Sequence, residues 1–284
     1  MLKKLFGLAP KPEPDGSYSP SKLALKLATS DTTDFEPVAS TQYQGERSKV
    51  LVIFTEQKNM EMQNGKLFST GNHPVEALLP MLHLKNAGFD FDIVTPTGKP
   101  VVFEMWAFPH QDHHVEAIYR AYKTQFEQPK SLQDFVSSGL PDDGSYAAVF
   151  VPGGHGSMLG IPDNQAVNDV LRWAHDQDLI TITLCHGPGS LLATTLNEQA
   201  FLYAGYNMAV FPDSVDNMTP MLGYLPGKMT SSLGETLKGL GVRLVNTKAD
   251  DTVCVDRNLI TGAAPQAANN LGKRAVEELL QKLQ

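Results

Sequence analysis

The sequence is poor in cysteine, in long apolar runs and in clustered positive charge. Only two cysteines, Cys185 and Cys254, occur in 284 residues, which excludes a disulfide-stapled scaffold and favours the reducing cytoplasm. No window approaches the roughly 18 apolar residues of a membrane span. The N-terminal apolar stretch stops at Pro10, too early for a signal-peptide core. We therefore expect a cytoplasmic protein that has no membrane partner.

Charge excludes a further class of protein. The net charge is −8 and the sequence contains no basic run. Binding to nucleic acid is usually driven by a positive patch. We therefore expect no specific nucleic-acid site.

From Lys49 onward, apolar strands alternate with amphipathic helices. Continuous apolar runs are typical of strands buried on both faces, and apolar residues at helical spacing are typical of covering helices. Predicted strands are 50–54, 89–93, 147–151 and 179–184; predicted helices are 74–87, 164–175, 189–196 and 267–283. This alternation predicts an α/β fold with an open, mostly parallel sheet and helices on both faces.

Two segments stand outside this alternation. Residues 1–47 are rich in Pro, Ser, Thr and Asp, and we interpret them as an arm that carries a short helix at 22–28. The core then runs from 48 to 284. Residues 105–143 exceed an ordinary connection, so we expect them to form an inserted cap or small subdomain with the arm.

Cys185 is the strongest candidate for chemistry. It follows an apolar strand directly and precedes His186-Gly187-Pro188-Gly189 and a predicted helix. Backbone N–H groups at a helix start favour an anion, so we expect the thiol to have a pKa below its usual ~8.5 and to act as a nucleophile. The alternative is a buried structural cysteine. Cys254 lies within a predicted strand and is interpreted as structural.

Other polar residues each allow two interpretations. Gly153 and Gly154 end a strand and would supply an oxyanion hole or simply a tight turn. Glu76 would transfer protons at the sheet edge or face solvent in the first helical turn. Asp213 or Asp216 would orient His186 or remain a loop acid. A cluster of His110, Asp112, His113 and His114 suggests a metal site or a solvated loop, and the spacing favours the loop.

Taken together, several motifs resemble the ThiJ/PfpI superfamily. The resemblance runs from about Val50 to the C-terminus and is carried by four segments: Gly65-Lys66-Leu67-Phe68-Ser69-Thr70-Gly71-Asn72-His73-Pro74, Val151-Pro152-Gly153-Gly154-His155-Gly156, Leu184-Cys185-His186-Gly187-Pro188 and Phe211-Pro212-Asp213. More narrowly, the chain is similar to the bacterial heat-shock chaperone branch that has glyoxalase III activity. This resemblance implies a flavodoxin-like fold, with the cysteine on a strained turn.

The resemblance also implies roles for particular residues. The matching triad is Cys185, His186 and Asp216, and the helix carboxyl group is Glu76. Glutathione-independent conversion of methylglyoxal to D-lactate is implied, without a cofactor, by a homodimer. Deglycation of modified proteins, a holding chaperone role for unfolded proteins and weak peptidase activity are implied as well.

The sequence departs from the branch at its metal site. The branch has two histidines and one acid in a cleft, and the matching positions here are Lys85, Asp90 and Tyr122. A lysine ammonium repels a cation, so we expect no metal.

The mechanism that we expect uses Cys185 and proton transfer. The thiolate attacks the aldehyde carbon of a small 2-oxoaldehyde, and backbone N–H groups near Gly153, Gly154 and His186 hold the oxyanion. Glu76 or His186 then moves a proton between the adjacent carbons. No redox cofactor is needed, because oxidation of one carbon offsets reduction of its neighbour. A holding chaperone and a weak cysteine peptidase remain the alternatives.

Overall fold

The computed structural model describes residues 7–37 and 42–284, so part of the predicted arm lies outside the described residues. Its centre is a seven-stranded sheet in the order β12-β13-β9-β8-β3-β6-β7, in which only β12 runs antiparallel to its neighbour. Their bounds in that order are Val253–Asp256, Leu259–Gly262, Ile180–Leu184, Tyr146–Val151, Lys49–Ile53, Asp90–Thr95 and Lys130–Ser131. The predicted α/β fold with a mostly parallel sheet is confirmed.

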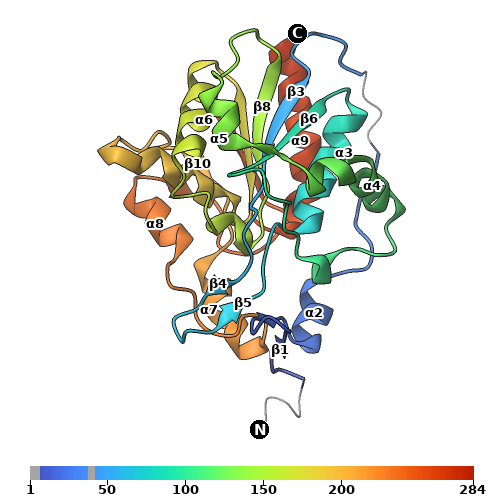
Figure 1. Ribbon diagram of the computed structural model, residues 1–284, viewed down its shortest axis with the longest axis vertical. Coiled ribbons are helices and arrows are strands. Elements are labelled where there is room, and N and C mark those ends of the chain that lie inside the picture. The colour runs from blue at the N-terminus through green and yellow to red at the C-terminus, as the bar shows by residue number, and fades with distance from the viewer. Residues whose placement is uncertain (1–6, 38–41) are drawn as a thin grey trace.

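Both faces of the sheet are covered by helices (Figure 1). Successive strand residues point to opposite faces, and in β3 Val50 and Val52 enter one apolar cluster while Leu51 and Ile53 enter the other. The first cluster includes α3 (Pro74–Asn86), α4 (His113–Glu127) and α9 (Ala268–Leu283). The second includes α5 (Leu132–Ser137), α6 (Gln165–Asp176), the 3-10 segment η3 (Gly187–Glu198) and α8 (Leu233–Gly239).

Residues 105–143 differ from the cap that we expected. Helix α4 buries Val115, Ile118, Tyr122 and Phe126, and all four belong to the first apolar cluster, with α3 and α9. Strand β7 then joins the edge of the sheet beside β6. The segment packs on the core because its apolar residues recur every three or four positions and so form one continuous helical face.

The arm contacts the start of this segment, where the Thr33 N–H donates to Asp112 Oδ2 and the Gln111 N–H donates to Asp31 O, and it also lies beside the strand ends. Its strands β1 (Lys11–Pro12) and β2 (Tyr18–Ser19) form a small sheet with β5 (Leu67–Phe68) and β4 (Met60–Glu61). Helix α2 (Lys22–Ala28) begins at Ser21, whose hydroxyl accepts a hydrogen bond from Ala24 N. The Ser21 N–H donates to Gly223 O, at the end of α7 (Asp213–Leu222). These elements gather at the end of the molecule opposite the C-terminus (Figure 1).

The remaining elements are short. They are η1 (Met105–Ala107), η2 (His155–Met158), β10 (Asn207–Met208), β11 (Arg243–Leu244) and η4 (Pro265–Ala267). No helix within residues 7–37 and 42–284 is long and apolar enough to cross a membrane.

Segments that follow β8 and β9 carry Gly153, Gly154 and Cys185, so the carboxyl ends of the parallel strands bring these residues to one edge of the sheet.

Gly272 provides a test of the packing between α3 and α9. A methyl group there would lie 2.6 Å from His83 Cδ2 and 3.0 Å from Pro80 Cα. Because Pro80 Cα is backbone, Gly272→Ala should lower the free energy of unfolding by about 1–3 kcal/mol, measured by denaturant titration. Gly239→Ala is the matched control, since nothing lies within 4 Å of the added atom. An equally stable Gly272→Ala protein would contradict this packing.

Candidate active site

Cys185 occupies a strained turn at the end of β9. Its φ is +60°, a left-handed backbone conformation that residues other than glycine rarely adopt. Two backbone hydrogen bonds hold it there: Cys185 N–H donates to Gly262 O at 2.8 Å, and Phe211 N–H donates to Cys185 O at 3.0 Å. The backbone two residues later lies close to β8, and a Cβ at Gly187 would lie only 2.6 Å from Val151 O. The thiol is therefore fixed in position by the backbone.

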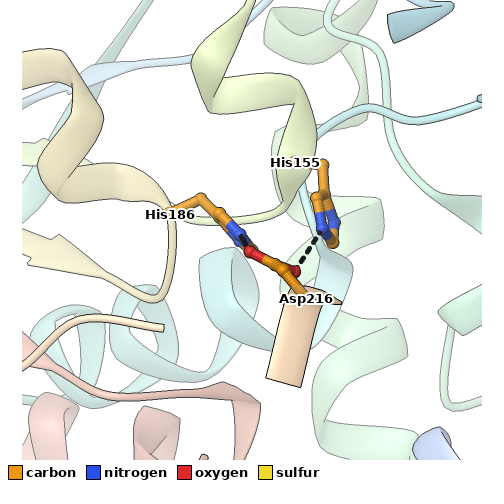
Figure 2. A group of neighbouring side chains, drawn as sticks. All are labelled: His155, His186 and Asp216. Atoms are coloured by element: carbon orange, nitrogen blue, oxygen red, sulfur yellow. Dashed lines mark hydrogen bonds and ion pairs between the residues drawn. The ribbon is translucent and has the colours of Figure 1, made fainter. Parts of the chain in front are cut away.

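Asp216 is shared by two histidines (Figure 2). Its Oδ2 is 2.9 Å from His186 Nε2, and its Oδ1 is 3.1 Å from His155 Nε2. On its other side, His186 Nδ1 is 3.3 Å from Cys185 Sγ. The predicted residues Cys185, His186 and Asp216 are thus brought into one hydrogen-bonded chain.

Asp216 carries the negative charge of this hydrogen-bonded triad. Burial by itself would raise the pKa of Asp216, but the charge of His186 and the hydrogen bonds from both histidines lower it well below its usual range. Asp216 is therefore ionised at neutral pH. His186 is stacked on Phe211, with ring centroids 4.8 Å apart, and its ring centroid is 4.0 Å from that of His155. These rings fix the orientation of the imidazole beside the thiol.

Glu76 lies inside the protein and not in solvent. It sits in the first turn of α3 and is 0% exposed, which excludes the solvent-facing interpretation. A Cβ at Gly153 would lie 2.0 Å from Glu76 Oε2 and 2.8 Å from Cys185 Cβ, so the carboxyl group and the thiol residue flank the same glycine. Burial raises the pKa of Glu76 well above its usual value, while interaction with the Cys185 thiol opposes that rise.

The low thiol pKa that we expected is wrong. Burial raises the pKa of Cys185 well above its usual value, and the charges of Glu76 and Asp216 raise it further. The Gly154 N–H lowers it, but this single donor is outweighed. The sequence argument considered the helix start alone, and did not include the two buried carboxyl groups that the fold places nearby. Cys185 and Glu76 therefore form a like-charge pair that disfavours ionisation of both members at once.

The predicted oxyanion residues line the same space. Gly154 has a φ of +96°, and a Cβ there would lie 2.5 Å from His73 N. The Gly154 N–H lowers the pKa of both the Cys185 thiol and the Glu76 carboxyl group. Gly153 O accepts from His73 N at 3.0 Å, which ties this turn to the start of α3. The arrangement suits a backbone donor aimed at an oxygen on the carbon that sulfur attacks.

A cavity of about 240 Å³ joins these groups. Glu76, Gly154, Cys185 and His186 line it, and the arm closes one side with Ala24, Leu27 and Ala28 of α2. Apolar residues of and near α7 form another side: Phe211, Val215 and Leu222. The volume and the mostly apolar lining suit a small organic molecule.

The sequence reasoning missed four titratable residues of this cavity: His73, Glu104, His155 and Tyr224. Burial and the charge of His155 lower the pKa of His73 to about 3, so His73 is neutral. Burial raises the pKa of Glu104 to about 7. A lone acid that follows the apolar run 101–103 was the available sign of Glu104, and the motif of Gly153 and Gly154 already contains His155.

Other candidates lie outside the cavity. Asp213 accepts from Gly234 N and Glu235 N and so caps α8. Asp112 caps α4 by accepting from His114 N and Val115 N, so His113 and His114 belong to the first turn of a helix and not to a solvated loop. Cys254 is half-buried in β12, with Sγ 3.5 Å from Asn207 O, which agrees with a structural residue.

The three positions that match the metal site of the branch lie together. Lys85 Nζ is 3.1 Å from Asp90 Oδ1, and the Tyr122 hydroxyl donates to the same oxygen at 2.5 Å. Zinc requires several Cys, His, Asp or Glu ligands. Here the single carboxylate is already paired with an ammonium group and a phenol, so this residue set does not fit zinc.

The fold and the site define an α/β protein with a cysteine on a strained turn beside a His–Asp pair. The chain belongs to the DJ-1/PfpI family, which matches residues 67–210. It is 43% identical over 266 residues to protein/nucleic acid deglycase HchA of Escherichia coli (strain K12 / DH10B), covering 94% of this chain and 93% of that protein.

Solved structures share the fold. The crystal structure of glyoxalase III from Candida albicans superposes with a TM-score of 0.64 at 19% identity, covering 82% of this chain and 97% of that one. The crystal structure of APC35852 superposes with a TM-score of 0.68 at 24% identity, covering 83% of this chain and 99% of that one. At these identities the likeness concerns the fold.

Alkylation tests the electrostatics of Cys185. Because burial and Glu76 raise the pKa of the thiol, the rate of its reaction with iodoacetamide should keep rising through pH 9. Glu76→Gln removes a negative charge, lowers the thiol pKa and should speed alkylation at pH 8 by about tenfold for each pKa unit. Peptide mass spectrometry measures both cysteines, and Cys254 is the internal control. Rapid alkylation of Cys185 at pH 7 that Glu76→Gln leaves unchanged would contradict this account.

Chelation tests the metal site. We expect the purified protein to hold no stoichiometric zinc by elemental analysis and to keep its activity after prolonged treatment with EDTA or phenanthroline. The double variant Lys85→His/Tyr122→His supplies two histidines around Asp90, and is a positive control that should bind zinc. Activity lost on chelation and restored by zinc in the unaltered protein would refute the expectation. That result would redirect attention to His155, His186 and Asp216, whose ligand-type atoms lie within 4.8 Å of one another.

Proposed function

We propose that the protein is a glutathione-independent glyoxalase that converts methylglyoxal to D-lactate with Cys185 as nucleophile. We propose that it also removes methylglyoxal adducts from glycated proteins. The observation that carries the proposal is the convergence of Cys185, His186 and Glu76 on one cavity, with Asp216 behind His186. The relatives support it, because the Escherichia coli protein at 43% identity is named a deglycase and a glyoxalase III has the same fold.

In the proposed first step, the S–H of Cys185 adds across the aldehyde C=O. Sulfur bonds to C1, and the thiol proton passes by way of His186, whose Nδ1 is 3.3 Å from Sγ, to the oxygen of C1. Asp216 holds the imidazole in place and stabilises its charged form while it carries the proton. The raised thiol pKa makes this relay necessary, because little free thiolate exists at pH 7.

Glu76 then acts on the carbon atoms. Its carboxylate takes the proton from C1 and returns it to C2 after the electron pair has moved, while one proton passes from the oxygen of C1 to the oxygen of C2. The product is a lactoyl thioester of Cys185. The raised pKa of Glu76 makes it a stronger base than an exposed carboxylate. Water releases lactate and restores the thiol. Oxidation at C1 and reduction at C2 cancel, so we propose no cofactor.

The size of the cavity favours small substrates over peptides. About 240 Å³ holds a 2-oxoaldehyde or a modified side chain, and α2 closes one side. A peptidase needs an open groove for an extended chain, so we rank weak peptidase activity below glyoxalase and deglycase activity. A cytoplasmic location, a homodimer and the division into an arm (1–47) and a core (48–284) remain parts of the proposal.

A holding chaperone is a second candidate because of one surface feature. Leu27 of α2 and Met218, Met221 and Leu222 of α7 are 67%, 49%, 62% and 45% exposed. Exposed apolar side chains on neighbouring helices are typical of surfaces that bind unfolded protein. Such holding would not need the thiol. Folded Cys185→Ala protein should therefore still suppress the aggregation of a heated client.

The decisive test is D-lactate formation from methylglyoxal without glutathione. Cys185→Ala should abolish it, while Cys254→Ser should keep most of the activity because Cys254 lies outside the cavity. A stereospecific D-lactate assay measures the product, and circular dichroism confirms that both variants fold. No lactate from the unaltered protein, or an active Cys185→Ala variant, would sink the proposal.

A further inference from the structure

Glu104 is a second buried carboxyl group in the cavity, on a different segment from Glu76. It precedes η1 and is 1% exposed. Its Oε1 accepts a hydrogen bond from the Thr70 hydroxyl at 2.6 Å. Its Oε2 is buried and has no hydrogen-bond partner within residues 7–37 and 42–284. A buried polar atom without a partner costs stability, so its retention at the edge of a cavity points to a ligand.

The groups around Glu104 define its charge. His155 of η2 lowers its pKa, Thr70 and the Gly71 N–H lower it less, and burial outweighs them all and raises it to about 7. Glu76 and Tyr224 are the other titratable groups within electrostatic reach. No lysine or arginine lines the cavity among the described residues. Glu104 can therefore give and take a proton near neutral pH, without a cation that would hold it ionised.

The proposed reaction needs such a group. Converting the Cys185 adduct to the thioester moves one hydrogen from C1 to C2, and one from the oxygen of C1 to the oxygen of C2. Glu76 serves the carbons. In the intermediate cis-enediol the two oxygens lie side by side, within reach of a single carboxyl group.

We propose that Glu104 is a catalytic residue that carries the proton between the two substrate oxygens. As Glu76 removes the C1 proton, the protonated Glu104 donates to the C2 oxygen and the C1=C2 bond forms. As Glu76 returns its proton to C2, the Glu104 carboxylate takes the proton from the C1 hydroxyl and the thioester C=O forms. Both carboxyl groups end as they began. This inference rests on the proposed function.

Substitution of Glu104 tests the shuttle through kcat and its pH dependence. Glu104→Gln cannot exchange a proton and should lower kcat by about 10²–10⁴-fold with little change in KM. Because Glu104 must start protonated, kcat of the unaltered enzyme should fall as pH rises through about 7, and Glu104→Gln should lose this alkaline limb. Glu104→Asp, which keeps the carboxyl group, should recover part of the rate. Glu61→Gln, at an exposed glutamate, is the matched control.

Thr70→Val supplies an independent readout that keeps the carboxyl group. The Thr70 hydrogen bond lowers the pKa of Glu104, so its loss should move the alkaline limb of kcat to higher pH. Unchanged kcat in Glu104→Gln, or a limb that stays in place in Thr70→Val, would overturn the shuttle. Lactate formation by the unaltered enzyme that requires Cys185 would still stand in that case. Its absence would instead refute the proposed function itself.

Discussion

The left-handed backbone of Cys185 is the constraint on which the site depends. A φ of +60° costs free energy for a residue with a side chain. Hydrogen bonds to Gly262 and from Phe211 hold it, so the strain is balanced by β13 and by the segment that leads to α7. The same turn sends the next residue, His186, toward Asp216 on α7. Nucleophile and base are therefore placed by one local conformation.

Close backbone approach is the second requirement of the site. Gly153 lies against both Glu76 and Cys185, and any side chain there would fill the space between them. Asn72 joins the backbone segments at Thr55 and Val102 by hydrogen bonds. Its amide nitrogen donates to Thr55 O and Val102 O, and its Oδ1 accepts from Thr55 N. Glu104 is held to the same residue, because its N–H donates to Asn72 O. The two buried carboxyl groups thus rest on rigid backbone, which limits their reorganisation during proton transfer.

The electrostatic balance of the cavity differs from that of an activated thiolate site. Glu76, Glu104 and Asp216 surround the cysteine, while the histidines supply the compensating donors. Burial raises the pKa of Cys185, Glu76 and Glu104, and only Asp216, which is bonded to two imidazoles, is held ionised. Such a set favours proton transfer between the thiol, the imidazole and the carboxyl groups over attack by a free thiolate.

The sequence by itself determined the β/α order and the residues at the strand ends, because buried strands and amphipathic helices leave periodic apolar patterns and a parallel sheet gathers its carboxyl ends at one edge. Cys185 and His186 could be proposed from position alone, whereas Glu76 and Asp216 needed the family resemblance. Only the tertiary structure decided that 105–143 packs on the core, that Glu76 is buried, that the thiol pKa is raised, and that His155 and Glu104 join the site. These depend on burial and on charges from segments far apart in the chain, which no local pattern records.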